Sequence, residues 1–371
     1  MLSTPTSWRL ALLTAGLLGP LSWAEAQQRY NPIVTAVPFL SLSPDARSSA
    51  LGQAGVALSP DANSAFYNAG RLSFVPADYG LSASYIPWLR NHNSATWLGS
   101  MAGYARLSQR SVIGADLRYL NRSYSLANSG ATSEYAVGAS YSYQLNEHLG
   151  VGMTVRYIRV NTDSTQTPDQ SVAASLGVYH HKDLGTGPYK LGLGAAINNI
   201  GYMLAYTRPA YANPPRADYL PTTLQIGGAL TRTFTVNSTL TLTVDASKLL
   251  VPTPPSQINP AAANSVFDSM VASFSDAPGG AREEAREVRL STGVEYAYKQ
   301  MIFARAGYYY ENKLKGDGTY ASVGFGVHYG SLGFDGTYLI PDSRQNPFTQ
   351  VFRLSLHATL HKAQPADPQR T

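Results

Sequence analysis

Hydrophobic and polar residues alternate with a period of two along residues 286–360. Between Val288 and Tyr298, every second residue is apolar, aromatic or threonine, whereas the residues between them are charged or small. This is the period of an extended strand, whose successive side chains point to opposite faces. We predict five consecutive strands here: 288–298, a strand that ends at Tyr310, 321–329, 332–340 and 352–360.

The two faces of these strands differ in a way that is typical of a membrane wall. One face is rich in Gly, Ser and opposed charges, which suits a water-filled lumen, and the other is apolar with aromatic residues near the strand ends. A soluble sandwich also alternates, but its polar face is the outer one and its apolar face fills a core. The pattern therefore favours strands with lipid on one side and a wet lumen on the other.

Nine further alternating stretches precede these five, which gives fourteen predicted strands. An even count is expected for a closed antiparallel barrel with both termini on one side, and closure removes the sheet edges that lipid cannot satisfy. We therefore predict an all-β fold, a 14-stranded antiparallel transmembrane β-barrel of the outer membrane. The nine stretches lie near 78–87, 97–107, 111–121, 134–145, 149–160, 171–181, 189–200, 223–232 and 238–248.

The connections between these strands alternate between two length classes. In outer-membrane barrels short turns face the periplasm and long loops face outside, so we expect both termini in the periplasm. The short connections are 108–110, 146–148, 182–188, 233–237, 299 and 330–331, and the mostly longer ones are 88–96, 122–133, 161–170, 201–222, 249–285, 312–318 and 341–349.

Residues 27–77 do not belong to the wall, because they are rich in turn-forming residues. Pro60–Asp61 followed by Ala62–Phe66 predicts a short helix, and a fourteen-stranded lumen has room for a plug. We predict that this segment lies inside or under the barrel. Asp61, Asn63 and Asn68 are interpreted as helix caps and plug hydrogen bonds; calcium ligation is the alternative, although the spacing of a calcium loop is absent.

Residues 249–285 form the longest predicted outer loop of the barrel, which itself spans 78–360. The loop contains Pro252, Pro254 and Pro255 and a predicted short helix near 265–274. Prolines that rigidify a long loop lower the entropy that is lost when the loop binds a partner. We interpret Glu283–Glu284 as part of a solvated rim.

The two ends of the chain are not part of the predicted barrel. Residues 1–26 have one early cation, an apolar run and an Ala-Glu-Ala site, which predicts a signal peptide that is cleaved before Gln27. The apolar run is too short to span a bilayer as a helix. Residues 361–371 form a polar tail.

The amino-acid composition also favours a membrane protein over a soluble one. The chain has no cysteine, which excludes disulfides and thiolate sites, and only 14% of its residues are charged, about half the usual share of a soluble protein. Its 25 tyrosines against 11 phenylalanines are typical of a membrane-interface girdle. The net charge of +5 comes from scattered Lys and Arg residues without runs, so we expect no nucleic-acid partner.

Few residues suggest catalysis or metal binding. His180 and His181 are neighbours on a strand and point to opposite faces, so we do not expect them to form a metal pair. Ser355 and His357 share a face, as a hydrolase would need, but no third partner can be assigned. We expect no catalytic residues, metal or cofactor.

Nine short motifs stand in the chain after the predicted signal peptide: Thr35–Leu40, Ser43–Arg47, Gly52–Val56, Ser59–Ser64, Tyr85–Arg90, Lys248–Pro255, Phe274–Gly280, Arg305–Tyr308 and Tyr338–Pro341. In matching order, these motifs resemble the PorV family, the outer-membrane component of the type IX secretion system of Bacteroidota within the FadL-like barrel superfamily. Two features depart from the pattern. Tyr67–Gly70 stands where FadL-like plugs usually read Asn-Pro-Ala, and the last strand ends at Leu360 without a terminal aromatic residue.

The resemblance implies a carrier and not an enzyme. Such proteins collect secreted cargo at the translocon barrel by binding its C-terminal signal domain. They then pass it to a sortase-like cysteine-peptidase partner, which attaches the cargo to lipopolysaccharide at the outer-membrane surface. Trp and Arg are typical interface anchors, and we predict a docking surface that is made by Trp88, Leu89, Arg90, Val251, Pro252, Pro254, Pro255, Phe274, Asp276, Pro278, Gly279 and Gly280.

Two other functions remain open from the sequence. The fold and plug alone are also compatible with a FadL-like channel for the uptake of small hydrophobic molecules, although such a route does not need Pro-rich outer loops. The shared face of Ser355 and His357 leaves a barrel hydrolase as the third interpretation.

Overall fold

The computed structural model describes residues 30–88, 96–122, 132–161, 168–205, 217–253, 265–342 and 352–361. The chain divides into two units, residues 1–30 and 31–371. All described residues except Tyr30 belong to the second unit, which is a barrel with its plug. The predicted signal peptide and all of the tail after His361 lie outside the described residues.

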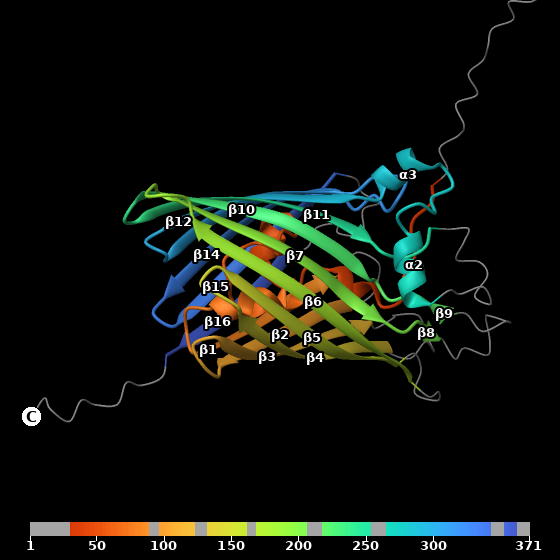
Figure 1. Ribbon diagram of the computed structural model, residues 1–371, viewed down its shortest axis with the longest axis horizontal. Coiled ribbons are helices and arrows are strands. Elements are labelled where there is room, and N and C mark those ends of the chain that lie inside the picture. The colour runs from red at the N-terminus through yellow and green to blue at the C-terminus, as the bar shows by residue number, and fades with distance from the viewer. Residues whose placement is uncertain are drawn as a thin grey trace, which may run out of the picture. The chain divides into compact units, whose positions relative to one another are not determined.

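Fourteen of the described strands form one closed antiparallel sheet, in which β1 pairs with both β2 and β16 (Figure 1). This confirms the predicted fold class. A separate pair, β8 (Leu204–Ala205) and β9 (Ala217–Asp218), was not predicted. The wall strands are β1 (Tyr79–Trp88), β2 (Thr96–Arg106), β3 (Ser111–Arg122), β4 (Thr132–Gln144), β5 (Leu149–Asn161), β6 (Asp169–Asp183), β7 (Tyr189–Gly201), β10 (Thr223–Thr235), β11 (Ser238–Leu249), β12 (Arg289–Tyr298), β13 (Ile302–Tyr310), β14 (Tyr320–Tyr329), β15 (Leu332–Pro341) and β16 (Phe352–Leu360).

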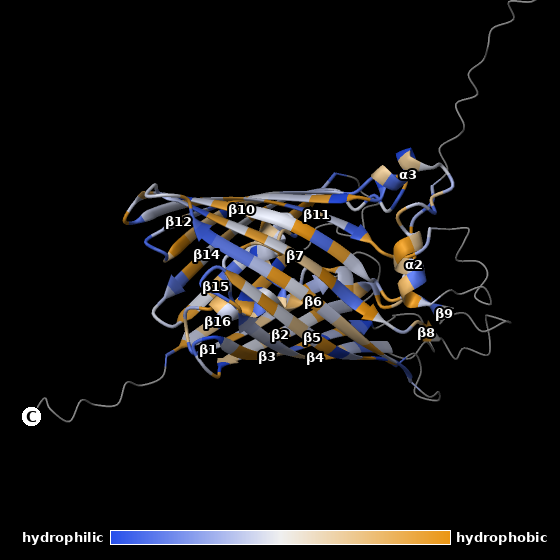
Figure 2. Ribbon diagram, in the orientation of Figure 1, coloured by the Kyte–Doolittle hydropathy of each residue, from blue (hydrophilic) through white to orange (hydrophobic). Residues whose placement is uncertain are grey.

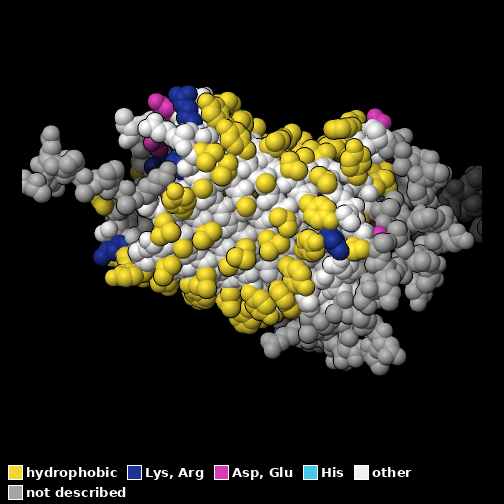
Figure 3. All heavy atoms as spheres, turned by 90° about the horizontal axis from the view of Figure 1, so that it is seen from below, with side chains coloured by type: hydrophobic (Ala, Val, Ile, Leu, Met, Phe, Trp, Pro, Cys, Tyr) yellow, Lys and Arg dark blue, Asp and Glu magenta, His cyan; other side chains and the backbone are white. Residues whose placement is uncertain are grey.

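Side chains along the wall strands alternate between the lumen and the outer surface, which gives the banded colouring of Figure 2. In β12, Leu290 and Tyr296 are exposed on the outside, whereas Ser291 and Glu295 are buried in the lumen. Figure 3 shows hydrophobic side chains spread over one face of the barrel exterior. This is the arrangement that lipid requires outside and a polar interior allows inside.

The turns that join β12 to β13 and β14 to β15 lie at the end of the barrel where β16 ends, and the helices α2 and α3 lie at the opposite end (Figure 1). We call these the short-turn end and the long-loop end. At the first turn Lys299 and Gln300 have φ values of 54° and 53°, and Met301 N–H donates to Tyr298 O at 3.0 Å. These are features of a type I′ turn, here built without glycine.

Short helices of the N-terminal segment lie inside the barrel (Figure 1). Each of the last three begins after a side chain that accepts a backbone N–H: Asp45, Asp61 and Asn68. The predicted helix at 62–66 is confirmed, with Asp61 and Ser64 forming a capping box. The elements are η1 (Pro38–Ser41), α1 (Ala46–Ala50), η2 (Ala62–Phe66) and η3 (Ala69–Phe74).

Wall glycines allow the plug backbone to come close. A Cβ atom at Gly307 would lie 2.2 Å from Gly52 N, and one at Gly194 would lie 2.1 Å from Val56 O. Any side chain at these positions would push the plug from the wall. Among the described residues, no helix combines the length and apolar character needed to cross a membrane.

Candidate functional site

Buried polar side chains of the wall hold the plug. The Asp245 carboxylate of β11 accepts the N–H groups of Gly55 and Val56 at 2.7 and 2.9 Å. On the other side of the lumen, Arg353 Nη1 of β16 donates to Ser43 O at 2.8 Å. Hydrogen bonds to charged groups are the stronger class, so these contacts stabilise the plug inside the barrel.

A chain of ion pairs links plug and wall at the short-turn end of the plug. It runs from Asp61 through Arg47 and Glu295 to Arg305 and Asp335, with N–O distances of 3.0, 2.8, 2.6 and 2.6 Å. Both ends of the chain are carboxylates. Because Glu295, Arg305 and Asp335 are buried, breaking one pair would leave an uncompensated charge in the lumen.

A cavity of about 620 Å³ lies below the plug, and the turn residues Gly330 and Ser331 contribute to its lining. Its wall includes both partners of the Arg47–Glu295 pair and His357. The cavity therefore has charged groups among its lining, unlike the mostly apolar pockets that hold small hydrophobic ligands.

At the long-loop end, five charged residues form what we call the rim cluster: Lys248, Glu283, Glu284, Glu287 and Lys315. Lys248 Nζ lies 3.0 Å from Glu284 and 2.5 Å from Glu287, and Lys315 Nζ lies 2.9 Å from Glu287 and 2.5 Å from Glu283. The cluster joins α3 (Ala281–Arg286) to β11 and to the β13–β14 loop. Glu283–Glu284 was interpreted as a solvated rim; this is wrong for Glu284, whose side chain is only 12% exposed.

The same glutamates order the loop that precedes α3. Asp276 accepts the N–H of Thr253 at 3.0 Å, and Gly279 N–H donates to Glu283 at 2.7 Å. Gly280, with φ 66°, is the N-cap residue of α3. The two halves of the predicted loop motif, around Thr253 and around Asp276, are thereby brought together.

Two loop carboxyls titrate away from their ordinary range. Burial raises the pKa of Asp276, and the nearby Glu284 acts in the same direction, while the Thr253 N–H opposes it. Burial would also raise the pKa of Glu283, but hydrogen bonds from Lys315, Asn31 and Gly279 outweigh it and lower that pKa. Glu283 is thus held in its charged form by its partners.

The helix α2 (Val266–Ala272) and the turn after it carry three large apolar side chains outward. Phe267, Val271 and Phe274 are 68%, 74% and 53% exposed, and Figure 2 shows α2 largely in the hydrophobic colour. Phe274 also lines a groove of about 340 Å³ with Leu224 and Ile226 of β10. The barrel thus presents an apolar stripe at its long-loop end.

The inward side of α2 carries Ser269 between the half-buried Val266 and Ala272. Ser269 is buried and its hydroxyl lies 3.0 Å from that of Tyr219, and Ser273 is fully buried. Ser265 caps the helix by accepting the Asp268 N–H. A helix on a protein surface normally buries its large apolar side chains, whereas α2 exposes Phe267 and Val271.

The sequence matches one protein family over residues 24–256, more than half of the chain, and that family is described as "Type IX secretion system protein PorV". The chain belongs to the PorV family. With the closed barrel, this makes it an outer-membrane component of the type IX secretion system, as the sequence motifs predicted. A search of curated proteins finds no significant match.

Solved structures with the same fold include hydrocarbon channels. The CymD monoaromatic hydrocarbon channel aligns with a TM-score of 0.52 and 12% identity, over 87% of this chain and 99% of that one. The toluene transporter TbuX of Ralstonia pickettii aligns with a TM-score of 0.50 and 12% identity, over 86% and 98%. At this identity the likeness concerns the fold, which the PorV-family chain shares.

The docking residues predicted for this PorV-family barrel lie at the long-loop end where they are described. Val251 and Pro252 are buried, whereas Phe274, Pro278 and Gly279 are exposed. Gly280 is the N-cap residue of α3. Trp88 is the last residue of β1. Leu89, Arg90, Pro254 and Pro255 lie outside the described residues.

The predicted plug residues of the PorV-family barrel have local roles. Pro60 lines the cavity and precedes Asp61, the cap of η2, while the Asn63 N–H donates to Asp61. Asn68 caps η3 and donates through Nδ2 to Val178 O at 2.8 Å, so it also joins plug to wall. Asp61 and Asn68 are therefore structural caps, whereas Asn63 contributes its backbone N–H to the Asp61 cap.

Ser355 of the hydrolase interpretation contacts other groups. Its hydroxyl lies 2.7 Å from that of Ser84 and accepts the Ala46 N–H at 2.8 Å. His357 instead faces Asp335. Sequence reasoning missed Phe267 and Val271, although their spacing with Phe274 is that of one helical face.

Proposed function

We propose that this PorV-family barrel binds the folded C-terminal signal domain of secreted cargo at its long-loop end. It receives the cargo at the translocon barrel and delivers it to a sortase-like cysteine-peptidase partner. The observation that carries this function is the outward apolar stripe of α2, held on a rim that is itself fixed by buried ion pairs.

Three aromatic or branched side chains exposed on α2 and the turn that follows it favour a protein partner. Contiguous apolar patches on a protein surface mark binding sites, and large apolar side chains at the centre of an interface supply most of its binding energy. The rim cluster orders the loop before binding, which lowers the entropy lost on association. The proposed docking surface includes Phe267, Val271 and Phe274 together with Pro278 and the end of β1 at Trp88.

In this function the long-loop end faces the cell exterior, and both termini face the periplasm. Folded cargo domains, the translocon barrel and the attachment partner then meet the docking surface on the lipopolysaccharide side. The wall residues around the groove near Phe274 are exposed to the outer leaflet, so the surface is continuous with lipid-facing residues such as Ile226. The barrel contributes binding and no catalysis.

The triple variant Phe267→Ala, Val271→Ala, Phe274→Ala tests this function. We expect it to insert and fold as the wild type does, because these side chains are exposed. We also expect purified cargo signal domain to bind it at least about tenfold more weakly, since each buried aromatic contact is worth about 1–2 kcal/mol. The measurement is binding to detergent-solubilised protein, with heat-modifiable migration as the test of folding.

A matched control is Phe234→Ala with Val236→Ala, which truncates exposed apolar side chains of the β10–β11 hairpin at the short-turn end. We expect it to bind the signal domain as the wild type does. Equal affinities of the triple variant and the wild type would contradict the proposed docking surface.

A second candidate, passage of small hydrophobic molecules, is favoured by the fold shared with hydrocarbon channels. The plug and the charged cavity wall argue against it. Uptake of labelled toluene by proteoliposomes, at a rate above that of protein-free vesicles, would support a channel.

A further inference from the structure

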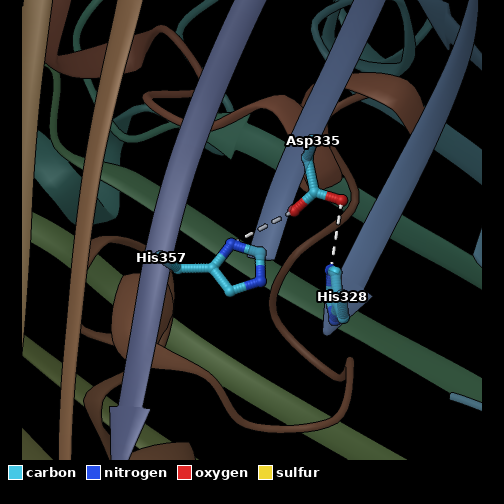
Figure 4. A group of neighbouring side chains, drawn as sticks. All are labelled: His328, Asp335 and His357. Atoms are coloured by element: carbon cyan, nitrogen blue, oxygen red, sulfur yellow. Dashed lines mark hydrogen bonds and ion pairs between the residues drawn. The ribbon is translucent and has the colours of Figure 1, made fainter. Parts of the chain in front are cut away.

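Three side chains of the last strands converge on the cavity below the plug: His328 of β14, Asp335 of β15 and His357 of β16 (Figure 4). The register explains how they meet. Gly333 of β15 pairs with His328 on one side and with His357 on the other. Neighbouring strands are about 4.8 Å apart, so the two histidine backbones are separated by a strand that carries no side chain at that position.

The missing side chain lets the two imidazole rings approach. Their centroids lie 4.4 Å apart, and a Cβ atom at position 333 would lie 1.9 Å from His357 Nε2. Gly326 makes room for the Asp335 carboxylate in the same way, because a Cβ atom at position 326 would lie 2.2 Å from Asp335 Oδ1. The wall is therefore hollowed where the three groups meet.

The distances between the groups suit ligands of one ion. His328 Nε2 lies 3.5 Å from Asp335 Oδ1, and His357 Nδ1 lies 3.4 Å from Asp335 Oδ2. Good hydrogen bonds are shorter, about 2.7–3.2 Å. Each of the two distances is made to a different oxygen of the carboxylate, and each lies within the range of about 3.3–3.6 Å that separates ligand atoms around a tetrahedral ion with bonds of about 2.0–2.2 Å. Among the described residues, these three form the one group with all ligand atoms within 4.8 Å of one another.

The surroundings keep the site anchored and accessible. Asp335 is buried and receives Arg305 Nη1 on Oδ1 at 2.6 Å, and Glu295 balances the Arg305 charge. Its other oxygen faces His357. The His328 ring packs on Phe303, with centroids 4.3 Å apart, while 28% and 22% of the two histidine side chains are exposed to the cavity.

We propose that His328, His357 and Asp335 bind one divalent transition-metal ion, of the class that prefers two imidazoles and a carboxylate, such as Zn²⁺. Three protein ligands leave a fourth position for water from the cavity. The bound ion joins β14, β15 and β16. Through the ion pairs of Asp335, Arg305, Glu295 and Arg47, it also supports the plug.

The test is Zn²⁺ titration of the purified, metal-free barrel in detergent by calorimetry, with Co²⁺ absorption as a second readout. We expect one site per chain, visible bands of four-coordinate Co²⁺, and a higher unfolding temperature with Zn²⁺. His328→Ala with His357→Ala removes two ligands and should weaken binding by at least about tenfold. The control His148→Ala with His180→Ala alters one histidine of the β4–β5 turn and one of β6, away from the proposed site. It should bind as the wild type does.

Gly333→Ala covers the case in which the double histidine variant does not fold. It keeps all three ligands but displaces His357, so we expect weaker Zn²⁺ binding and altered Co²⁺ bands. The site is refuted if the wild type binds no Zn²⁺. It is equally refuted if the control loses binding while His328→Ala with His357→Ala keeps it, which would mean adventitious binding near His148.

Discussion

Asp245 shows how much a single side chain contributes to the plugged barrel. Its carboxylate satisfies two neighbouring N–H groups of the plug, at Gly55 and Val56. Both groups are buried, so they have no water to replace the carboxylate. A buried donor without a partner costs free energy that an exposed one does not.

We predict that Asp245→Ala lowers the free energy of unfolding by about 2–4 kcal/mol, since it leaves two buried N–H groups unsatisfied. Reversible urea unfolding of the detergent-folded barrel measures this. Asp183→Ala serves as the control, because Asp183 is exposed and its pair with Lys190 is long, 3.8 Å, and it should change the value by less than about 0.5 kcal/mol. Similar losses in the two variants would contradict the role of Asp245.

At this scale the sequence predicted those residues whose role is local. Asp61 as a cap follows from its place before a run of small residues, and the structure confirms it. His328, Asp335 and His357 could not be grouped, because their meeting depends on the register of three strands and on Gly333 between them. The docking roles of Trp88 and Pro278 stay predictions.

At the scale of elements, the loop that carries α2 and α3 depends on the rim cluster. Its two lysines each contact two glutamates, and Glu287 contacts both lysines. Glu283 connects this cluster to the backbone of Gly279. The packing of this loop against the barrel therefore depends on the charge of Glu283.

We predict that Glu283→Gln increases hydrogen exchange of residues 276–286 at pH 7. Because the pKa of Glu283 is lowered in the folded protein, its charge stabilises the docked loop above the ordinary pKa of a glutamate. This contribution disappears as pH falls through the lowered pKa. The difference between variant and wild type should therefore shrink as the pH falls below the ordinary pKa of a glutamate, and it should vanish once the pH lies below the lowered pKa. A difference that persists under acidic conditions would exclude an electrostatic origin.

Strands could be predicted from the sequence where each of their two faces contacts a single medium, either lipid or the polar lumen. The wall strands meet lipid outside and polar groups inside, so a period of two is imposed on each. The short plug helices pack on the wall and on one another, so no face of theirs meets a single medium. Their caps at Asp45, Asp61 and Asn68 mark them instead. The sequence predicted η2 and the cap at Asn68, but not the helices η1, α1 and η3.

For the whole molecule, the plug decides whether the lumen conducts. An unobstructed fourteen-stranded barrel is wide enough to hold water. Here buried plug residues occupy its middle, and Arg118 and Arg353 donate to the plug carbonyls of Leu40 and Ser43. A filled lumen together with the proposed docking surface at the long-loop end fits a protein that binds partners and does not conduct solutes.

We predict that the wild-type barrel shows little ion conductance in planar bilayers, and that Arg118→Ala with Arg353→Ala raises it severalfold by loosening the plug. Arg110→Ala, at an exposed turn, should leave conductance unchanged. High conductance of the wild type would mean that the plug does not fill the lumen.

The seam between β1 and β16 determines how the finished barrel forms. The plug precedes β1 in the chain, yet it contacts Arg353 and Ser355 of β16, the strand made last. The plug is therefore held beside the strand pair that closes the cylinder. Because the closed sheet has no open edge, this segment has no route out through the side of the cylinder and can leave only through one of its ends.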